Sequence, residues 1–122
     1  MNSRQRAERK GRWAETFACL ALQLKGYRLL ARRFKTPLGE IDLIMRKGRV
    51  TAFIEVKARH IADASLEAVT PTAQRRIALA ADLWLRRDAR SVGADHRFDI
   101  VAVAPYRWPV HFENAFSARE HP

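Results

Sequence analysis

Two neighbouring runs of alternating apolar and charged residues contain the side chains that are best suited to chemistry. Asp42 lies in the first run, and Glu55 and Lys57 lie in the second. Carboxylate and carbonyl oxygens are the ligands that Mg²⁺ prefers, together with water molecules that it retains. We therefore expect Asp42, Glu55 and the backbone carbonyl of Val56 to bind Mg²⁺ or Mn²⁺. Lys57 should lie beside that cation.

The reaction that suits this set of residues is hydrolysis of a phosphodiester bond. A divalent cation polarises a phosphoryl oxygen and lowers the pKa of bound water, and the ammonium group of a lysine supports developing negative charge. The same residues are also compatible with an ordinary amphipathic hairpin, whose charged face is solvated and held by ion pairs between the strands. The residue pattern leaves both interpretations open.

The two runs are expected to form a β-hairpin of residues 39–45 and 50–57, joined by a glycine-containing turn at 46–49. Side chains alternate between the two faces of a strand, so Glu40 and Asp42 share one face. With a turn of two or four residues, Glu55 would lie across from Glu40 and diagonal to Asp42. Carboxylates this close repel one another, so the hairpin needs a compensating cation.

The remaining sequence predicts helices and strands that complete one α/β domain over residues 1–122. Apolar residues recur at helical spacing before Gly26, and Thr70-Pro71 has the composition of a helix start. The expected elements are a helix at about 4–25, strands at 27–34, 39–45 and 50–57, a helix from 70, and strands at 98–103 and 110–116. This order, α-β-β-β-α-β-β, favours a mixed central sheet flanked by helices, with the last strand at an edge.

Each helix should bury an apolar stripe against the sheet. The stripes consist of Trp13, Phe17, Leu20, Ala21 and Leu24 in the first helix, and of Ile77, Ala80, Ala81, Trp84 and Leu85 in the second. Two of the three tryptophans therefore belong to the expected core, which leaves Trp108 in a loop as a candidate nucleic-acid contact. Cys19 is expected to be a small buried residue, and Asp99 a structural hydrogen-bond acceptor.

Basic residues outnumber acidic ones over the whole chain. Twenty-three Lys and Arg against thirteen Asp and Glu give the 122 residues a formal net charge of +10, which predicts a polyanionic partner. Nucleic acid, and DNA in particular, is favoured over an anionic membrane surface. The basic residues expected to contact it are Arg9, Lys10, Arg12, Arg32, Arg33, Arg59, Arg75 and Arg76.

No stretch of the sequence approaches the apolar length that crosses a membrane, so we expect a cytoplasmic protein without a membrane partner. Glu15 and Gln23 interrupt the apolar stretch that follows the N-terminal arginines, which argues against an export signal. The single cysteine excludes an internal disulfide, and the four histidines lack the spacing of metal ligands. A homodimer is one of the oligomeric states that the sequence allows.

Several strings of residues resemble a known family. Asp42 followed by Glu55-Val56-Lys57 resembles the D…(D/E)-x-K signature of restriction-endonuclease-like nucleases, which include archaeal Holliday junction resolvases. Further strings are Gly11-x-x-x-Glu15, Gly26-Tyr27, Gly39 to Ile44, Phe53 to Arg59 and Arg97 to Val101. Together they are similar to the bacterial YraN family of predicted endonucleases over nearly the whole chain.

This resemblance implies a restriction-endonuclease-like core and assigns roles to individual residues. Asp42 and Glu55 would hold Mg²⁺, and Lys57 would be the catalytic lysine. Glu15, on the first helix, matches the position from which related resolvases add a further acidic group. Helical spacing alone instead places Glu15 away from the apolar stripe, as a solvated surface charge.

One position departs from the family pattern. Members of the family usually carry Lys immediately before the Gln that opens the second helix, whereas here Ala73 precedes Gln74. The accessory basic contact is then either absent or supplied by Arg75 or Arg76.

The expected function is a metal-dependent endonuclease that cuts DNA. Branched or otherwise structured DNA is favoured as its substrate. The basic side chains can contact the phosphate backbone and recognise the shape of the DNA, and no element that would read the base sequence is evident. The competing interpretation is a non-catalytic nucleic-acid-binding module with the same fold, in which the acidic face is a relic or contacts a protein partner.

Overall fold

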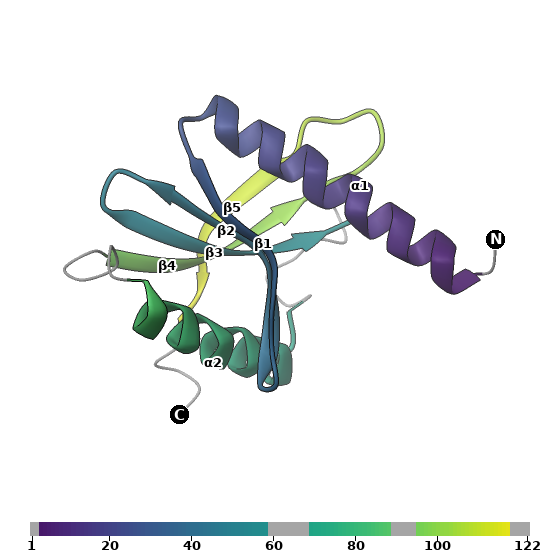
Figure 1. Ribbon diagram of the computed structural model, residues 1–122. Coiled ribbons are helices and arrows are strands. Elements are labelled where there is room, and N and C mark those ends of the chain that lie inside the picture. Colours follow the sequence, from purple (N-terminus) through teal and green to yellow (C-terminus); the bar gives the residue numbers. More distant parts are fainter. Residues whose placement is uncertain (1–2, 59–68, 89–94, 118–122) are drawn as a thin grey trace.

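The computed structural model describes residues 3–58, 69–88 and 95–117, with the backbone alone for residues 3–10. The elements follow the predicted order, as α1 (Ser3–Leu24), β1 (Arg28–Thr36), β2 (Gly39–Lys47), β3 (Val50–Lys57), α2 (Pro71–Arg87), β4 (Asp95–Ala102) and β5 (Val110–Phe116). One sheet separates the two helices, so that α1 covers one face and α2 covers the other (Figure 1). The predicted α/β class is confirmed.

The sheet contains both parallel and antiparallel pairs, as the sequence predicts. Its strands lie in the order β1-β2-β3-β4-β5, and β3 pairs with β4 in parallel while the other neighbours are antiparallel. Parallel neighbours need a long crossover connection, and α2 lies on the one between β3 and β4. The predicted place of β5 at an edge of the sheet is confirmed, and β4 lies in its interior.

The β2–β3 turn lies one residue further along the chain than predicted, and this changes the register of the hairpin. Lys47 pairs with Val50, so the turn consists of Gly48 and Arg49 alone, with Gly48 at a positive φ of 60°. Ile44 lies opposite Phe53 and Leu43 opposite Ile54. The predicted opposition of Glu40 and Glu55 is therefore wrong by two residues. A shift of two keeps every side chain on its face, so the predicted faces survive.

The side of α1 that packs on the sheet is not the predicted one. Small residues and one leucine form its buried face, namely Ala14, Ala18, Cys19, Ala21 and Leu22. Most of the predicted stripe points to solvent instead, and Trp13, Leu20 and Leu24 are 50%, 54% and 78% exposed. Helical periodicity cannot distinguish two apolar faces of one helix, and the face with small side chains allows the closer approach to the sheet. The prediction for Cys19 is confirmed.

Helix α2 begins and packs as the sequence predicts. The Thr70 side chain accepts a hydrogen bond from the backbone N–H of Ala73 at 3.1 Å, and Pro71 occupies the first helical turn. The buried face contains Ile77, and Trp84 makes an edge-to-face contact with Phe34 at 5.3 Å between ring centroids.

A buried ionic network joins β4, β5 and the connection between α1 and β1, and it accounts for Asp99. The carboxylate is fully buried and accepts two hydrogen bonds from Arg97, both at 2.8 Å. His111 lies 2.7 Å away, and the backbone N–H of Asn114 donates at 2.9 Å. Arg97 also donates to the Tyr27 hydroxyl at 2.6 Å. Burial alone would raise the pKa of Asp99, but these partners together hold it below its usual value. The predicted structural role is confirmed.

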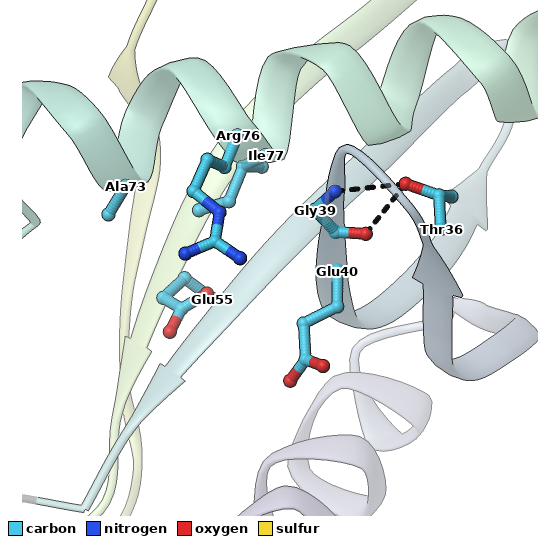
Figure 2. Close-up of a pocket in the computed structure, with 7 residues that line it drawn as sticks. All are labelled: Thr36, Gly39, Glu40, Glu55, Ala73, Arg76 and Ile77. Atoms are coloured by element: carbon cyan, nitrogen blue, oxygen red, sulfur yellow. Dashed lines mark hydrogen bonds between the residues drawn. The ribbon is translucent and has the colours of Figure 1, made fainter.

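Gly39 sets how closely α2 approaches the start of β2. A Cβ built at this position would lie 2.3 Å from the backbone oxygen of Arg76, which is far inside van der Waals contact. Thr36 closes the preceding turn, because its hydroxyl accepts from the N–H of Gly39 at 3.0 Å and donates to the carbonyl of the same residue at 2.7 Å (Figure 2). The helix and the β1–β2 turn therefore meet through backbone atoms at this point.

We predict that Gly39→Ala lowers the free energy of unfolding by about 2 kcal/mol or more, because α2 must move away from the sheet to make room for the methyl group. Urea unfolding measures the change. Gly11→Ala is the matched control, since a Cβ at Gly11 meets nothing within 4 Å, and helical Ala is favoured over Gly. Equal effects of the two substitutions would contradict the close contact at Gly39.

Candidate functional site

The acidic residues predicted to act together come from the middle of the sheet. Continuing the β2–β3 register by one pair places Asp42 opposite Glu55, and their side chains share a hydrogen bond. The backbone N–H of Val56 donates to Asp42 Oδ2 at 2.8 Å. Lys57 Nζ lies 3.6 Å from Glu55 Oε1. All these residues belong to the interior strands β2 and β3, and the predicted proximity of Asp42 and Glu55 holds.

The electrostatics of this acid pair, Asp42 and Glu55, are those of an incompletely neutralised site. Burial, followed by the charges of Glu15 and Glu40, raises the pKa of Asp42 to about 6, although the Val56 N–H opposes the shift. Burial and the neighbouring Asp42 raise the pKa of Glu55 to about 7, against the opposing effect of Lys57. The two carboxyl groups therefore hold a proton well above the pH at which free carboxyl groups lose it.

This donor set fits a hard divalent cation. Mg²⁺ is commonly held by one or two carboxylates, with water and substrate oxygens completing its shell, so Asp42 and Glu55 suffice. In residues 3–58, 69–88 and 95–117, no group of three or more histidine, cysteine, aspartate or glutamate side chains is placed to share one metal ion. A cation here would therefore depend on this acid pair together with backbone and solvent oxygens.

A pocket of about 290 Å³ opens beside the acid pair, between α2 and the sheet. Its lining residues come from β1, β2, β3 and α2, and they are Thr36, Gly39, Glu40, Glu55, Ala73, Arg76 and Ile77. Figure 2 shows the guanidinium group of Arg76 directed toward Glu55, with the carboxylate of Glu40 below. The pocket thus presents two carboxylates and one guanidinium group to whatever enters it.

The position that departs from the family pattern lies on this pocket wall. Ala73 contributes only a methyl group, and Arg76 follows one turn later on the same face of α2. Arg75 is exposed and is not among the lining residues. Of the two arginines that the sequence offered as substitutes, Arg76 is therefore the one that reaches the pocket.

Glu15 is buried, and the expectation from helical spacing that it is a solvated charge is wrong. Only 7% of the residue is exposed, and Arg33 donates to both carboxylate oxygens, at 2.9 and 3.2 Å. Its charge contributes to the raised pKa of Asp42, so Glu15 belongs to the electrostatic surroundings of the acid pair. This position agrees with the accessory acidic role that the resemblance implies.

Arg33 has a role in this site that the sequence did not predict. Its guanidinium group is bound to Glu15, and its expected contact with nucleic acid stays a prediction. Its backbone φ of 51° is unfavourable for a residue with a side chain, and it occupies the gap in the β1–β2 ladder opposite Asp42. No feature of the sequence signals this conformation, because neither glycine nor asparagine stands at the position.

The other basic residues predicted to contact nucleic acid are distributed over several elements. Arg12, Arg32 and Arg75 are exposed, and Arg32 donates to the Thr16 hydroxyl on α1 at 3.0 Å. Arg9 and Lys10 lie on the part of α1 whose side chains are not described, and Arg59 lies outside the described residues. Neither helix of the described ranges is long and apolar enough to cross a membrane.

The fold and the site define a small mixed α/β protein whose acid pair, with a neighbouring lysine, lies beside a pocket. By sequence it belongs to the Uncharacterised protein family UPF0102, which it matches over residues 14–103. A UPF0102 protein of Chelativorans sp. (strain BNC1) is 60% identical over 117 residues, covering 96% of this chain and 94% of the relative. The corresponding protein of Mesorhizobium japonicum is 54% identical with the same coverage, and one of Brucella canis is 52% identical over 109 residues, covering 89% of this chain and 86% of the relative.

We predict that, without divalent metal, the protein loses stability as the pH rises from about 4 to about 7. In this window the folded acid pair still holds protons that the unfolded chain has released, because the pKa values of Asp42 and Glu55 are raised to about 6 and about 7. Asp42→Asn removes one of the charges and can still accept from the Val56 N–H. Asp42→Asn should therefore reduce the decrease in the free energy of unfolding with rising pH, and it should stabilise the protein at pH 8 by roughly 1–2 kcal/mol.

Urea unfolding in the presence of EDTA across this pH range measures both effects. Asp82→Asn is the control, since it removes an exposed carboxylate on α2 and should change stability by no more than about 0.5 kcal/mol. If wild type and Asp42→Asn have the same pH dependence, the acid pair does not carry the electrostatic cost described above.

Proposed function

We propose that this protein is a metal-dependent endonuclease that hydrolyses phosphodiester bonds in DNA. The observation that carries the proposal is the acid pair of Asp42 and Glu55, with Lys57 Nζ 3.6 Å from Glu55, at the side of an open pocket. Raised carboxyl pKa values outside an obvious structural ion pair are typical of functional sites. Asp99 offers a contrast in the same sheet, because its buried carboxylate is fully hydrogen bonded and its pKa is lowered.

The roles follow from the chemistry of each group. Asp42, Glu55 and the Val56 carbonyl would hold Mg²⁺ or Mn²⁺, which supplies a polarised phosphoryl oxygen and a more acidic water when it is bound. The ammonium group of Lys57, which Glu55 keeps at the site, orients the attacking water and stabilises negative charge that develops on the phosphate. Glu15 adds negative charge near the acid pair, and the guanidinium group of Arg33 partly neutralises the charge of Glu15.

The net charge of +10 supports a nucleic-acid substrate, and phosphate contacts would position it. Structured or branched DNA remains the favoured form, since the exposed arginines are scattered over α1, β1 and α2 and are not gathered on one element that could enter a groove. A non-catalytic binding module with the same fold is the competing account. In that account Lys57 serves only to neutralise Glu55.

Lys57→Ala separates the two accounts. If Lys57 acts on charge that exists only in the transition state, its loss lowers turnover and leaves binding almost unchanged. We expect cleavage of DNA with Mg²⁺ or Mn²⁺ to fall about a hundredfold or more, while affinity for the same DNA changes less than about threefold. Lys57→Arg should not restore the rate fully, because a planar guanidinium cannot replace a compact ammonium beside a bound water.

Single-turnover cleavage and binding assays should use single-stranded, duplex, flapped and four-way DNA. Lys25→Ala is the control for loss of one positive charge, because Lys25 is exposed in the loop after α1. If the wild type cleaves none of these substrates with either metal, and Lys57→Ala binds them equally well, the binding module is the better account.

A further inference from the structure

An aromatic surface formed by Trp13, Phe17 and Trp108 lies outside the site described above. Trp13 and Phe17 come from α1, and Trp108 comes from the loop that joins β4 to β5, which arches beside α1 (Figure 1). The two tryptophans are 50% and 58% exposed. Large aromatic side chains are costly to expose, so two of them held together on the surface indicate a binding site.

The three rings of this aromatic surface are ordered by contacts with one another. The ring centroids of Trp13 and Phe17 are 5.2 Å apart, and those of Phe17 and Trp108 are 6.5 Å apart in an edge-to-face arrangement. Both distances are typical of favourable aromatic pairs. Phe17 thus holds both indoles in place, and a ligand that stacks on them loses little further side-chain entropy.

The charges around the aromatic surface favour an anionic ligand. Arg12 precedes Trp13 and Arg107 precedes Trp108, and both arginines are exposed. Among the α1 residues whose side chains are described, the one acid is Glu15, which is buried and bound to Arg33. The 103–109 loop contains no acidic residue. A ligand with flat apolar groups and negative charges at short intervals matches this composition.

We propose that the aromatic surface binds unpaired nucleotides, whose bases stack on Trp13 and Trp108 while their phosphates lie near Arg12 and Arg107. Stacking on aromatic rings beside basic residues is the general means by which proteins hold single strands without reading sequence. Bases in a duplex have no free face to offer such rings. The surface therefore selects DNA that contains a single-stranded segment, such as a flap or a fork.

This selection affects which DNA is cleaved only if the proposed nuclease function is correct. Helix α1 connects the aromatic surface with the acid pair. Trp13 and Glu15 project from opposite faces of the same helix, and Glu15 contributes to the electrostatic field at Asp42. An α-helix with its side chains is about 10–12 Å thick. An unpaired strand on the outer face of α1 would therefore be separated from Glu15 by the thickness of that helix.

Two other occupants fit the surface less well. A second copy of the chain would bring Arg12 and Arg107 toward the same residues of its partner, and like charges at a symmetric interface repel. An anionic membrane would match the charges, but membrane-binding helices need an apolar face that continues along the helix with basic residues on the opposite side. Here the opposite side of α1 is buried against the sheet.

The test is binding of fluorescently labelled oligo(dT) of about 15 nucleotides, measured by anisotropy at fixed salt in EDTA. A blunt duplex of equal length is the comparison. The combined Trp13→Ala and Trp108→Ala variant should bind oligo(dT) at least about fivefold more weakly, with a much smaller change for the duplex. Leu24→Ala is the matched control, because it removes an exposed apolar side chain of α1 that has no aromatic face and should leave both affinities unchanged.

Trp108→Ala alone repeats the test with a substitution confined to the loop, in case the combined variant is unstable. An unchanged affinity for oligo(dT), or equal losses for oligo(dT) and duplex, would overturn the proposal. The proposal would also be overturned if the tryptophan variants lost binding to phosphatidylglycerol vesicles, or lost self-association, and still bound oligo(dT) like the wild type. Because EDTA prevents metal-dependent cleavage, the binding result does not depend on the nuclease function. If the nuclease proposal alone were wrong, the wild type would bind oligo(dT) but would cut no DNA when metal is present.

Discussion

The pairing of β2 with β3 is the constraint on which the site depends, because it places two carboxylates side by side in the middle of a sheet. The register is locked on both faces: Ile44 and Phe53 pack toward α2, while Leu43 and Ile54 pack toward α1. A slip of one residue would turn each set toward the other helix, where the packing does not match it. The free energy gained by burying them in this register therefore exceeds the repulsion between the carboxylates, and the fold keeps the acid pair together despite its charge.

Three groups reduce that repulsion without removing it. The Val56 N–H binds Asp42, Lys57 pairs with Glu55, and Arg33 neutralises Glu15 next to them. Burial first, and then the charges of neighbouring carboxylates, still raise the pKa values of Asp42 and Glu55 to about 6 and about 7. Natural proteins keep such unfavourable arrangements mainly where function requires them, at a cost in stability.

The sequence predicted the fold order, the mixed sheet and the shared face of Asp42 and Glu55 well, since these depend on local periodicity and on turn composition. It failed where the outcome depended on tertiary contacts. The exact position of the turn at Gly48 decided which carboxylates lie opposite each other, and composition allowed several positions. The buried face of α1 could not be chosen because both faces are apolar, and this error hid the exposure of Trp13. The left-handed conformation of Arg33, which brings its guanidinium group to Glu15, leaves no trace in the residue types.

The central claim is that Asp42 and Glu55 form a binding site for a divalent cation, and calorimetric titration with Mn²⁺ tests it most directly. The account predicts that the wild type binds one Mn²⁺, that Asp42→Asn binds it at least about tenfold more weakly, and that the surface variant Asp82→Asn binds it like the wild type. A wild type that binds no Mn²⁺, or an Asp42→Asn variant whose affinity is unchanged, would contradict the account.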